Sequence, residues 1–273
     1  MVQHVAKWGS EITATMLLSL WARAQETNRP DALLHDPSAC KMVARLDYDF
    51  SVFRNAAFPQ AGACVRARVI DDELRASLVT NPRATVIQLG VGLDTRYARL
   101  HAYPFSYWYD LDLPEVIALR QELLPEGERN TYLAQSLFDY SWVETVQNEK
   151  QHVIIILEGV LMYFEPERVR AFFSEISQRF ERVTVIFDML IYGVLGKTLY
   201  KNKQLTTDAQ LAFRWSEIDS HIMETWNSKI HLVAEYYLSD YDHGRFPLLF
   251  RLLYRIPYFY RRFNQRVVRL EIY

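Results

Sequence analysis

The spacing of apolar positions changes near residue 84 and divides the chain into two kinds of structure. Before that point apolar residues recur at helical spacing. They predict a helix that ends at Asn28–Pro30, a second from the turn at 35–38 through Leu46, and a third over 61–78. After it, short apolar, β-branched runs alternate with helical segments. The predicted strands are 84–89, 106–111, 131–134, 153–157 and 183–187, and the predicted helices begin at 94, 114 and 166. This alternation indicates right-handed βαβ units and a parallel sheet with helices on both faces.

The alternation stops after the fifth strand. Residues 189–228 have a helical, aromatic-rich pattern, typical either of an insertion that covers a site or of ordinary packing. Residues 229–273 contain two strand-like runs, 231–238 and 266–273, with helical residues between them. We therefore expect one domain over 1–273. Its parts would be an N-terminal helical cap (1–80), a cofactor-binding core (84–188), a helical lid insertion (189–228) and terminal strands with a connecting helix (229–273).

Composition and charge exclude several classes of protein. The 273 residues are 50% hydrophobic, enough for a sizeable core, and the net charge of −2 lacks the basic footprint of a nucleic-acid binder. Cys40 and Cys64 are too few for a disulfide framework or a cysteine-rich zinc site. We expect no metal and a reduced, cytoplasmic setting. No signal-peptide pattern is seen in residues 1–10, and no apolar run is long enough to span a membrane.

A glycine turn follows the first predicted strand. Gly90 and Gly92 lie between a buried strand and a helix, where glycine permits a sharp turn and close approach of a ligand. The third glycine of a dinucleotide-binding turn is replaced by Thr95. The preceding Asp94 would compete for the helix N–H groups and repel phosphate. The turn therefore favours a cofactor without phosphate, although Asp94 is also expected to cap the helix.

Carboxylates follow two of the predicted strands. Asp110 and Asp112 share one face of an extended strand, and Asp112 lies 22 residues after Gly90, a spacing at which a carboxylate can meet a ribose diol. Either could serve, or both could only form a turn. Glu158 ends the apolar strand 153–157 and needs a partner there. That partner is either the ammonium group of a ligand or a structural arginine.

Two arginines precede the first strand on the helix 61–78. Arg66 and Arg68 are separated by about 200° around a helix, so only one can face a site. Arginine suits bidentate binding of a carboxylate. Spacing alone is also typical of surface charges.

Four segments together resemble the leucine carboxyl methyltransferase family, in particular its bacterial branch, which includes a polyketide carboxyl methyltransferase. The segments are Arg66-x-Arg68-x-x-Asp71-Asp72, Leu89-Gly-Val-Gly-Leu-Asp-Thr-Arg96, Asp110-Leu-Asp-Leu-Pro114 and Glu158-Gly-Val-Leu-Met-Tyr163. The resemblance extends from about residue 11 to the C-terminus. It implies an α/β, Rossmann-like class I methyltransferase fold with a seven-stranded, mostly parallel sheet, and S-adenosylmethionine as methyl donor.

The resemblance also implies roles for particular residues. Arg68, with Arg66 as second candidate, would hold the cofactor carboxylate, and Gly90 and Gly92 would lie under the methionine part. Asp112, with Asp110 as alternative, would bind the ribose. Glu158 would lie near the amino group or the reacting methyl. The family's acidic residue near the adenine is replaced by Ser136, followed by Leu137, so Asp139 could take over this contact. Gln88 stands where many methyltransferases have an acid.

These observations lead to a functional hypothesis and two alternatives. We expect S-adenosylmethionine-dependent O-methylation of a carboxylate or phenolic hydroxyl on a small, polyketide-like acceptor, with catalysis by positioning. Tyr163 is a weak catalytic candidate. His4, His152, His221 and His231 are conceivable bases, but no spacing selects one. Ser136 and Gln88 leave open a non-catalytic cofactor-binding protein. The missing third glycine disfavours an NAD-dependent oxidoreductase.

The C-terminal run 245–269 contains seven arginines interleaved with Phe, Tyr and Leu. Such a segment could lie on a membrane surface or on an acidic partner. We expect instead that its apolar side packs on the sheet while the arginine head groups stay solvated. The expected partner is a small-molecule acceptor, with no nucleic acid, and the oligomeric state is open.

Overall fold

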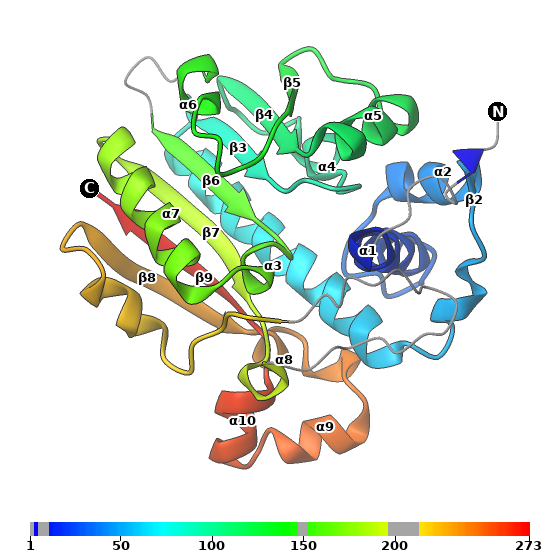
Figure 1. Ribbon diagram of the computed structural model, residues 1–273. Helices are drawn as coiled ribbons and strands as arrows, with labels where there is room; N and C mark the ends of the chain where they lie inside the picture. The colour runs from blue at the N-terminus through cyan, green and yellow to red at the C-terminus, as the bar shows by residue number, and fades with distance from the viewer. Residues whose placement is uncertain (1–2, 5–10, 147–151, 196–212) are drawn as a thin grey trace.

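A seven-stranded sheet forms the centre of the chain (Figure 1). A computed structural model describes residues 3–4, 11–146, 152–195 and 213–273. The sheet order is β5-β4-β3-β6-β7-β9-β8. Its strands are β3 (Thr85–Leu89), β4 (Tyr107–Asp112), β5 (Asn130–Ala134), β6 (Val153–Leu157), β7 (Val183–Met189), β8 (Ile230–Tyr237) and β9 (Arg266–Ile272). The first five are parallel to one another, so the predicted Rossmann-like fold is confirmed.

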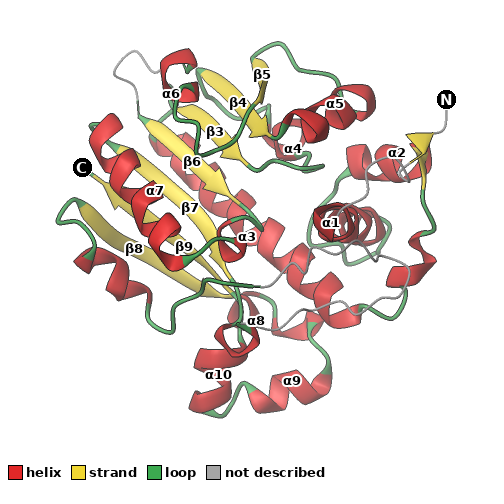
Figure 2. Cartoon of the chain, in the orientation of Figure 1, coloured by secondary structure: helices red, strands yellow, loops and turns green. Residues whose placement is uncertain are grey.

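The two faces of the sheet are covered by different helices. Val86, Ile154 and Ile156 pack with α3 (Ala57–Thr80) on one face. Alternate residues of the same strands pack with α7 (Pro166–Arg179) on the other face (Figure 2). Because β3, β6 and β7 are buried on both sides, they need continuous apolar runs. This explains why these strands are the clearest ones in the sequence.

The remaining helices of the core connect the parallel strands. They are α4 (Arg96–Leu100), α5 (Pro114–Leu123) and α6 (Trp142–Thr145). The predicted strands and helices of residues 84–188 are thus confirmed, with β7 extended to Met189. The final strand β9 is antiparallel to both of its neighbours, β7 and β8, and lies between them.

Two N-terminal helices cover the end of the sheet at which β3, β4 and β6 finish. These are α1 (Glu11–Thr27) and α2 (Pro37–Arg45), and α2 begins where the Asp36 side chain accepts a hydrogen bond from the Ala39 N–H. A short parallel pair, β1 (Gln3–His4) and β2 (Leu46–Asp47), and the 3-10 helix Phe50–Phe53 complete this part. The three predicted helices are confirmed, and α3 begins four residues earlier than expected.

The helical insertion expected over 189–228 is only partly covered by the described residues. Its described part contains the 3-10 helices Tyr192–Val194 and Ser220–Thr225 and no α-helix, while residues 196–212 lie outside the described residues. Trp215 is fully buried and lies against Phe187 of the sheet, so part of the aromatic content serves packing. The four-part division of the domain stays a prediction.

The C-terminal connection contains α8 (Leu238–Tyr241), the 3-10 helix His243–Arg245, α9 (Leu248–Leu253) and α10 (Pro257–Phe263). The expected packing of this run on the sheet is wrong for α9 and α10, which contain no buried residue. Only flanking side chains such as Phe246 and Tyr254 are buried. None of the helices among the described residues has the length and apolar character needed to cross a membrane.

Candidate functional site

A cavity of about 950 Å³ opens where β3, β4 and β6 end. Its walls come from the turns after these strands, from α1 and α3, and from residues of the C-terminal connection. The carboxyl ends of parallel strands are where open α/β sheets bind ligands. The cavity is therefore the candidate functional site.

The glycine turn forms one wall of this cavity. Gly90 and Gly92 have φ values of +67° and +51°, which favour glycine. A Cβ atom on Gly90 would also lie 2.5 Å from Cγ2 of Val160. The Gly90 N–H donates to the Leu111 carbonyl at 2.8 Å, which ties the turn to β4. Conformation and space thus both require glycine at position 90.

Asp112, the last residue of β4, lines the cavity next to this turn. Its carboxylate accepts hydrogen bonds from the N–H groups of Gly92, at 2.7 Å, and Leu113, at 2.8 Å. Burial raises the pKa of Asp112 above its ordinary value, although both N–H groups oppose the shift. A carboxylate has about four lone-pair sites, so two remain for a ligand.

Asp110 does not line the cavity, which corrects the expectation that either aspartate could bind the ribose. Its carboxylate is fully buried and pairs with Arg120 of α5 at 2.8 Å. It also accepts a hydrogen bond from Nε1 of Trp108 at 2.8 Å. The two aspartates share a strand face, but Asp110 lies two residues deeper, where Arg120 covers it. Only Asp112 reaches the cavity.

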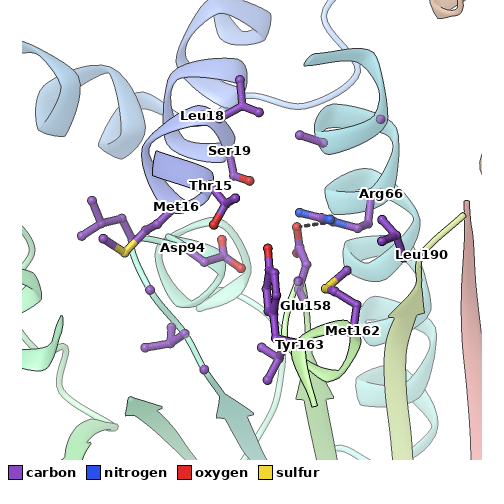
Figure 3. A pocket seen from close by; sticks show the side chains of 18 of the residues that line it. Thr15, Met16, Leu18, Ser19, Arg66, Asp94, Glu158, Met162, Tyr163 and Leu190 are labelled. Atoms are coloured by element: carbon purple, nitrogen blue, oxygen red, sulfur yellow. Dashed lines mark hydrogen bonds and ion pairs between the residues drawn. The ribbon is translucent and has the colours of Figure 1, made fainter. Parts of the chain in front are cut away.

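Arg66 and Glu158 face each other across the cavity wall (Figure 3). Nε of Arg66 lies 2.9 Å from Oε1 of Glu158, and its Nη1 lies 3.1 Å from Asp188. Arg96 reaches the other oxygen of Glu158 at 2.5 Å. Of the two partners considered for Glu158, the structural arginine is present, in two copies. Burial alone would raise the pKa of Glu158, but Arg66 and Arg96 hold it below its usual value, so the group is ionised.

Arg68 lies away from the cavity, contrary to the first assignment of the cofactor carboxylate. Its side chain is 40% exposed and pairs with Asp72 at 2.7 Å, one turn along α3. Its Nη1 donates to the Leu33 carbonyl. Residues two positions apart on a helix point in nearly opposite directions. Because Arg66 points into the protein, Arg68 points outwards. Arg66 is the arginine that the structure places at the site.

Asp188 and Arg96 lie behind the cavity wall, bind its charged residues and were not predicted from the sequence; nor were Arg23, Arg168 and Arg214, which line the cavity. Asp188 is fully buried near the end of β7 and binds Arg66, the Gly159 N–H and Gln265. It ends an apolar strand just as Glu158 does, so the same sequence signal could have found it. Arg96 had no comparable signal, because its contact with Glu158 depends on how α4 packs.

Asp94 is not the cap of α4, whose N-cap is Thr95. Its carboxylate instead binds Arg96 at 2.5 Å and Arg99 at 3.0 Å, and accepts from Nε2 of Gln88 at 2.7 Å. Although burial opposes it, the arginines hold the pKa of Asp94 well below its usual range. Oε1 of Gln88 is buried without a hydrogen-bond partner in the described residues. Gln88 lines the cavity, so this acceptor without a partner lies in its wall.

Ser136 and Leu137 follow β5 and line the cavity, as expected. Oγ of Ser136 accepts from the Phe138 N–H at 3.3 Å, so its own proton can be donated. Asp139 does not line the cavity and binds Ser141 at 2.8 Å. The structure therefore favours Ser136 over Asp139 as the polar group at this end.

Tyr163 lines the cavity opposite α1, and Thr15 and Ser19 of α1 lie across from it (Figure 3). Its ring stacks on Phe213, with 5.5 Å between centroids. Burial raises the pKa of the Tyr163 hydroxyl, so this group is protonated at neutral pH. It can donate a hydrogen bond, but it is not a base.

The histidines proposed as bases have other positions. His152 bonds Thr184 at 2.7 Å, His221 bonds Glu224 at 2.9 Å, and His231 stacks on Tyr273. The side chain of His4 is outside the described part of the chain. The described lining of the cavity contains no histidine, lysine or cysteine. The described residues also contain no group of three or more His, Cys, Asp or Glu suited to a metal ion.

Comparison with known proteins gives consistent results. Residues 16–177, more than half of the chain, match the leucine carboxyl methyltransferase family model. The tetracenomycin polyketide synthesis O-methyltransferase TcmP of Streptomyces glaucescens is 29% identical over 201 residues, covering 74% of this chain and 73% of that protein. The S-adenosyl-L-methionine-dependent methyltransferase dpfgK of Gibberella zeae is 29% identical over 181 residues, 61% and 60% of the two chains. The chain thus spans less than two thirds of the second relative.

A solved structure supports the fold. The S-adenosylmethionine-dependent methyltransferase of Anabaena variabilis ATCC 29413 superposes with a TM-score of 0.51 at 13% identity, covering 75% of this chain and 84% of that one. At this identity the likeness concerns the fold alone. The match over residues 16–177 shows what the fold alone cannot: this chain belongs to the leucine carboxyl methyltransferase family, and its cofactor is S-adenosylmethionine.

Proposed function

We propose that the protein transfers a methyl group from S-adenosylmethionine to an oxygen atom of a small, largely apolar acceptor, and that a carboxylate is the preferred acceptor group. The observation that carries this proposal is the cavity itself. One part of the cavity is lined by buried charged groups, and the other part by aromatic and aliphatic side chains. The described lining offers no histidine or lysine that could act as a base. A phenolic hydroxyl is the other acceptor group compatible with O-methylation.

The polar part of the cavity fits the cofactor by the chemistry of its groups. The unpaired acceptor of Gln88, the ionised Glu158 and the open lone pairs of Asp112 suit a ligand that carries cationic and hydroxyl groups. When bound, the cofactor supplies a methyl group that is already activated on a sulfonium. Glu158 would hold the ammonium group and Arg66 the carboxylate.

The remaining contacts follow the order of the strands. Asp112, at the end of β4, would accept hydrogen bonds from the ribose hydroxyls, and the turn at Gly90 and Gly92 would lie under the methionine part. Ser136 and Leu137, after β5, would border the adenine. Arg68 and Asp110 have no place in this arrangement, because neither lines the cavity.

The acceptor part of the cavity is predominantly apolar. Its side chains come from α3, from the turn after β6, from the end of β7, from residue 213 and from the C-terminal connection. They include Phe58, Met162, Leu190, Phe213, Phe246 and Tyr254. Such a surface suits an acceptor with a flat or extended hydrocarbon body. The acceptor needs a polar contact only at its reacting oxygen, where the Tyr163 hydroxyl can donate a hydrogen bond.

The lack of a base in the described lining favours a carboxylate over a phenol. A carboxylic acid has a pKa near 4 and is ionised at neutral pH, whereas a phenol has a pKa near 10 and would gain from a base. The lining carboxylates are bound by arginines or backbone N–H groups, and Tyr163 is protonated. The similarity to TcmP adds an analogy with polyketide O-methylation.

Labelled methyl transfer to a panel of aromatic carboxylic acids and matched phenols tests the proposal. We expect label in the acids as methyl esters, which alkali releases, unlike methyl ethers. Asp112→Asn should lower cofactor affinity, measured by calorimetry. Glu115→Gln, which removes a neighbouring exposed charge outside the cavity, should not. Cofactor binding without transfer to any acceptor would favour a non-catalytic binding protein, and alkali-stable label would refute the carboxylate preference.

A further inference from the structure

The helices α9 and α10 present an exposed apolar surface. Among the described residues, eleven large apolar side chains are exposed, and five of them fall between positions 248 and 258. They are Leu248 (67% exposed), Leu249 (63%), Leu252 (49%), Ile256 (47%) and Tyr258 (56%). Single exposed apolar residues are ordinary, but five of them within one short segment indicate an interaction site.

The same segment carries unneutralised positive charge. Arg251, Arg255, Arg261 and Arg262 form no ion pair within the described part of the chain. By contrast, the other three arginines of the run are paired: Arg245 with Glu26, Arg266 with Glu235 and Arg269 with Glu271. The sequence between Asp242 and Glu271 contains no acidic residue. We call the five exposed apolar residues and the four unpaired arginines the α9–α10 surface.

This surface is held on a packed support. Phe250 of α9 stacks on Phe58, with 4.1 Å between ring centroids. The hydroxyl group of the buried Tyr254 donates a hydrogen bond to the Phe263 carbonyl at 3.0 Å. This bond joins the end of α9 to α10. Figure 1 shows α9 and α10 together at the lower end of the molecule. The inner side chains fix the helices. Of the outer ones, Arg251 donates to the Phe246 carbonyl and Arg262 lies over the ring of Tyr258, whereas Arg255 and Arg261 are exposed.

The support also forms part of the candidate site. Phe58, Phe246 and Tyr254 line the acceptor part of the cavity. The α9–α10 surface therefore lies directly outside a wall of the cavity, formed by the same short segment. Whatever binds this surface lies close to the region where an apolar acceptor would enter.

We propose that the α9–α10 surface docks the protein on an anionic lipid bilayer. Leucine, isoleucine and tyrosine side chains would enter the interface between head groups and acyl chains, and the arginines would contact anionic head groups. A two-fold contact with a second copy would place these unpaired arginines against one another, which disfavours self-association. Charge complementarity thus points to an anionic surface, and the many exposed aliphatic groups point to lipid.

Vesicle sedimentation of the full chain tests the proposal. We expect binding to phosphatidylcholine–phosphatidylserine vesicles, weak binding to pure phosphatidylcholine, and loss of binding as salt is raised. The pair Arg255→Gln and Arg261→Gln should reduce the partition coefficient by roughly 25-fold, since each basic residue near such a surface contributes about fivefold. The pair Leu248→Ser and Leu249→Ser should reduce it at least about tenfold. Deleting the segment is unsuitable, because β9 follows it and belongs to the sheet.

The matched control is the pair Val79→Ser and Arg83→Gln, which removes one exposed apolar and one exposed basic side chain at the end of α3. These changes should leave vesicle binding unaltered. All variants should bind S-adenosylmethionine normally, which separates a failure of docking from a failure of folding or of the proposed function. Equal binding to both vesicle types, or equal loss in the control, would overturn the proposal. So would a dimer that the serine pair abolishes, or binding only to soluble polyanions.

Discussion

Replacing Asp110 by asparagine should destabilise the protein strongly while leaving cofactor affinity almost unchanged. Asp110 and Arg120 are both fully buried, with 2.8 Å between Oδ2 and Nη2. Asparagine keeps the shape and can still accept the hydrogen bond from Trp108. It leaves the guanidinium of Arg120 without its counter-charge, and breaking a buried pair in this way costs about 3–5 kcal/mol. The free energy of unfolding of a domain is typically about 5–15 kcal/mol, so this loss is a large fraction of the total stability.

Urea unfolding followed by circular dichroism measures the effect. With a slope of about 3 kcal/mol per molar urea, the midpoint should fall by about 1 M or more. The matched control is Glu175→Gln, because Glu175 and Arg179 form a pair of similar length, at 3.0 Å, with both side chains more than a third exposed. Its loss should cost under about 0.5 kcal/mol. A loss below about 1 kcal/mol for Asp110→Asn, or a large fall in cofactor affinity, would refute the role assigned to Asp110.

Three further predictions concern the cavity. Gly90→Ala should lower the free energy of unfolding by about 1–3 kcal/mol, because Gly90 has a positive φ and Val160 occupies the space of a Cβ atom. The control Gly62→Ala, within α3, should be neutral or stabilising in the same thermal unfolding measurement. Equal effects of the two substitutions would contradict this prediction. Arg66→Gln should weaken cofactor binding, measured by calorimetry, by about tenfold or more, and Arg68→Gln by less than about twofold. The reverse order would restore Arg68 as the residue that binds the cofactor carboxylate. Burial raises the pKa of Asp112, and cofactor binding needs the ionised carboxylate. As the pH is lowered, cofactor affinity should therefore begin to fall at a pH above about 4, the ordinary pKa of aspartate. Asp112→Asn should remove this dependence, and an unchanged pH profile would refute it.

The parts of the site that the sequence predicted are those with a local signal. Glu158 and Asp112 each end an apolar strand, and their place at the carboxyl edge of the sheet follows from the strand alone. Gly90 likewise follows from a strand that turns into a helix. These positions depend little on how distant elements pack, so one sequence is sufficient to find them.

The rest depends on packing that local patterns do not contain. The helix α3 is buried on nearly all sides, so its sequence has no clear polar face to show which of Arg66 and Arg68 points inward. Asp110 and Asp112 differ only in depth, which is decided by Arg120 from a separate helix. The composition of α9 and α10 favours burial, yet the fold leaves them outside.

The position of β9 between β7 and β8 has a consequence for biosynthesis. A ribosome releases β7 and then β8, but β8 joins the sheet only through β9, which comes some thirty residues later at 266–272. Until that strand emerges, β7 has an open edge whose N–H and C=O groups can pair with other chains. The nascent protein therefore passes through an aggregation-prone stage that ends only when β9 is inserted.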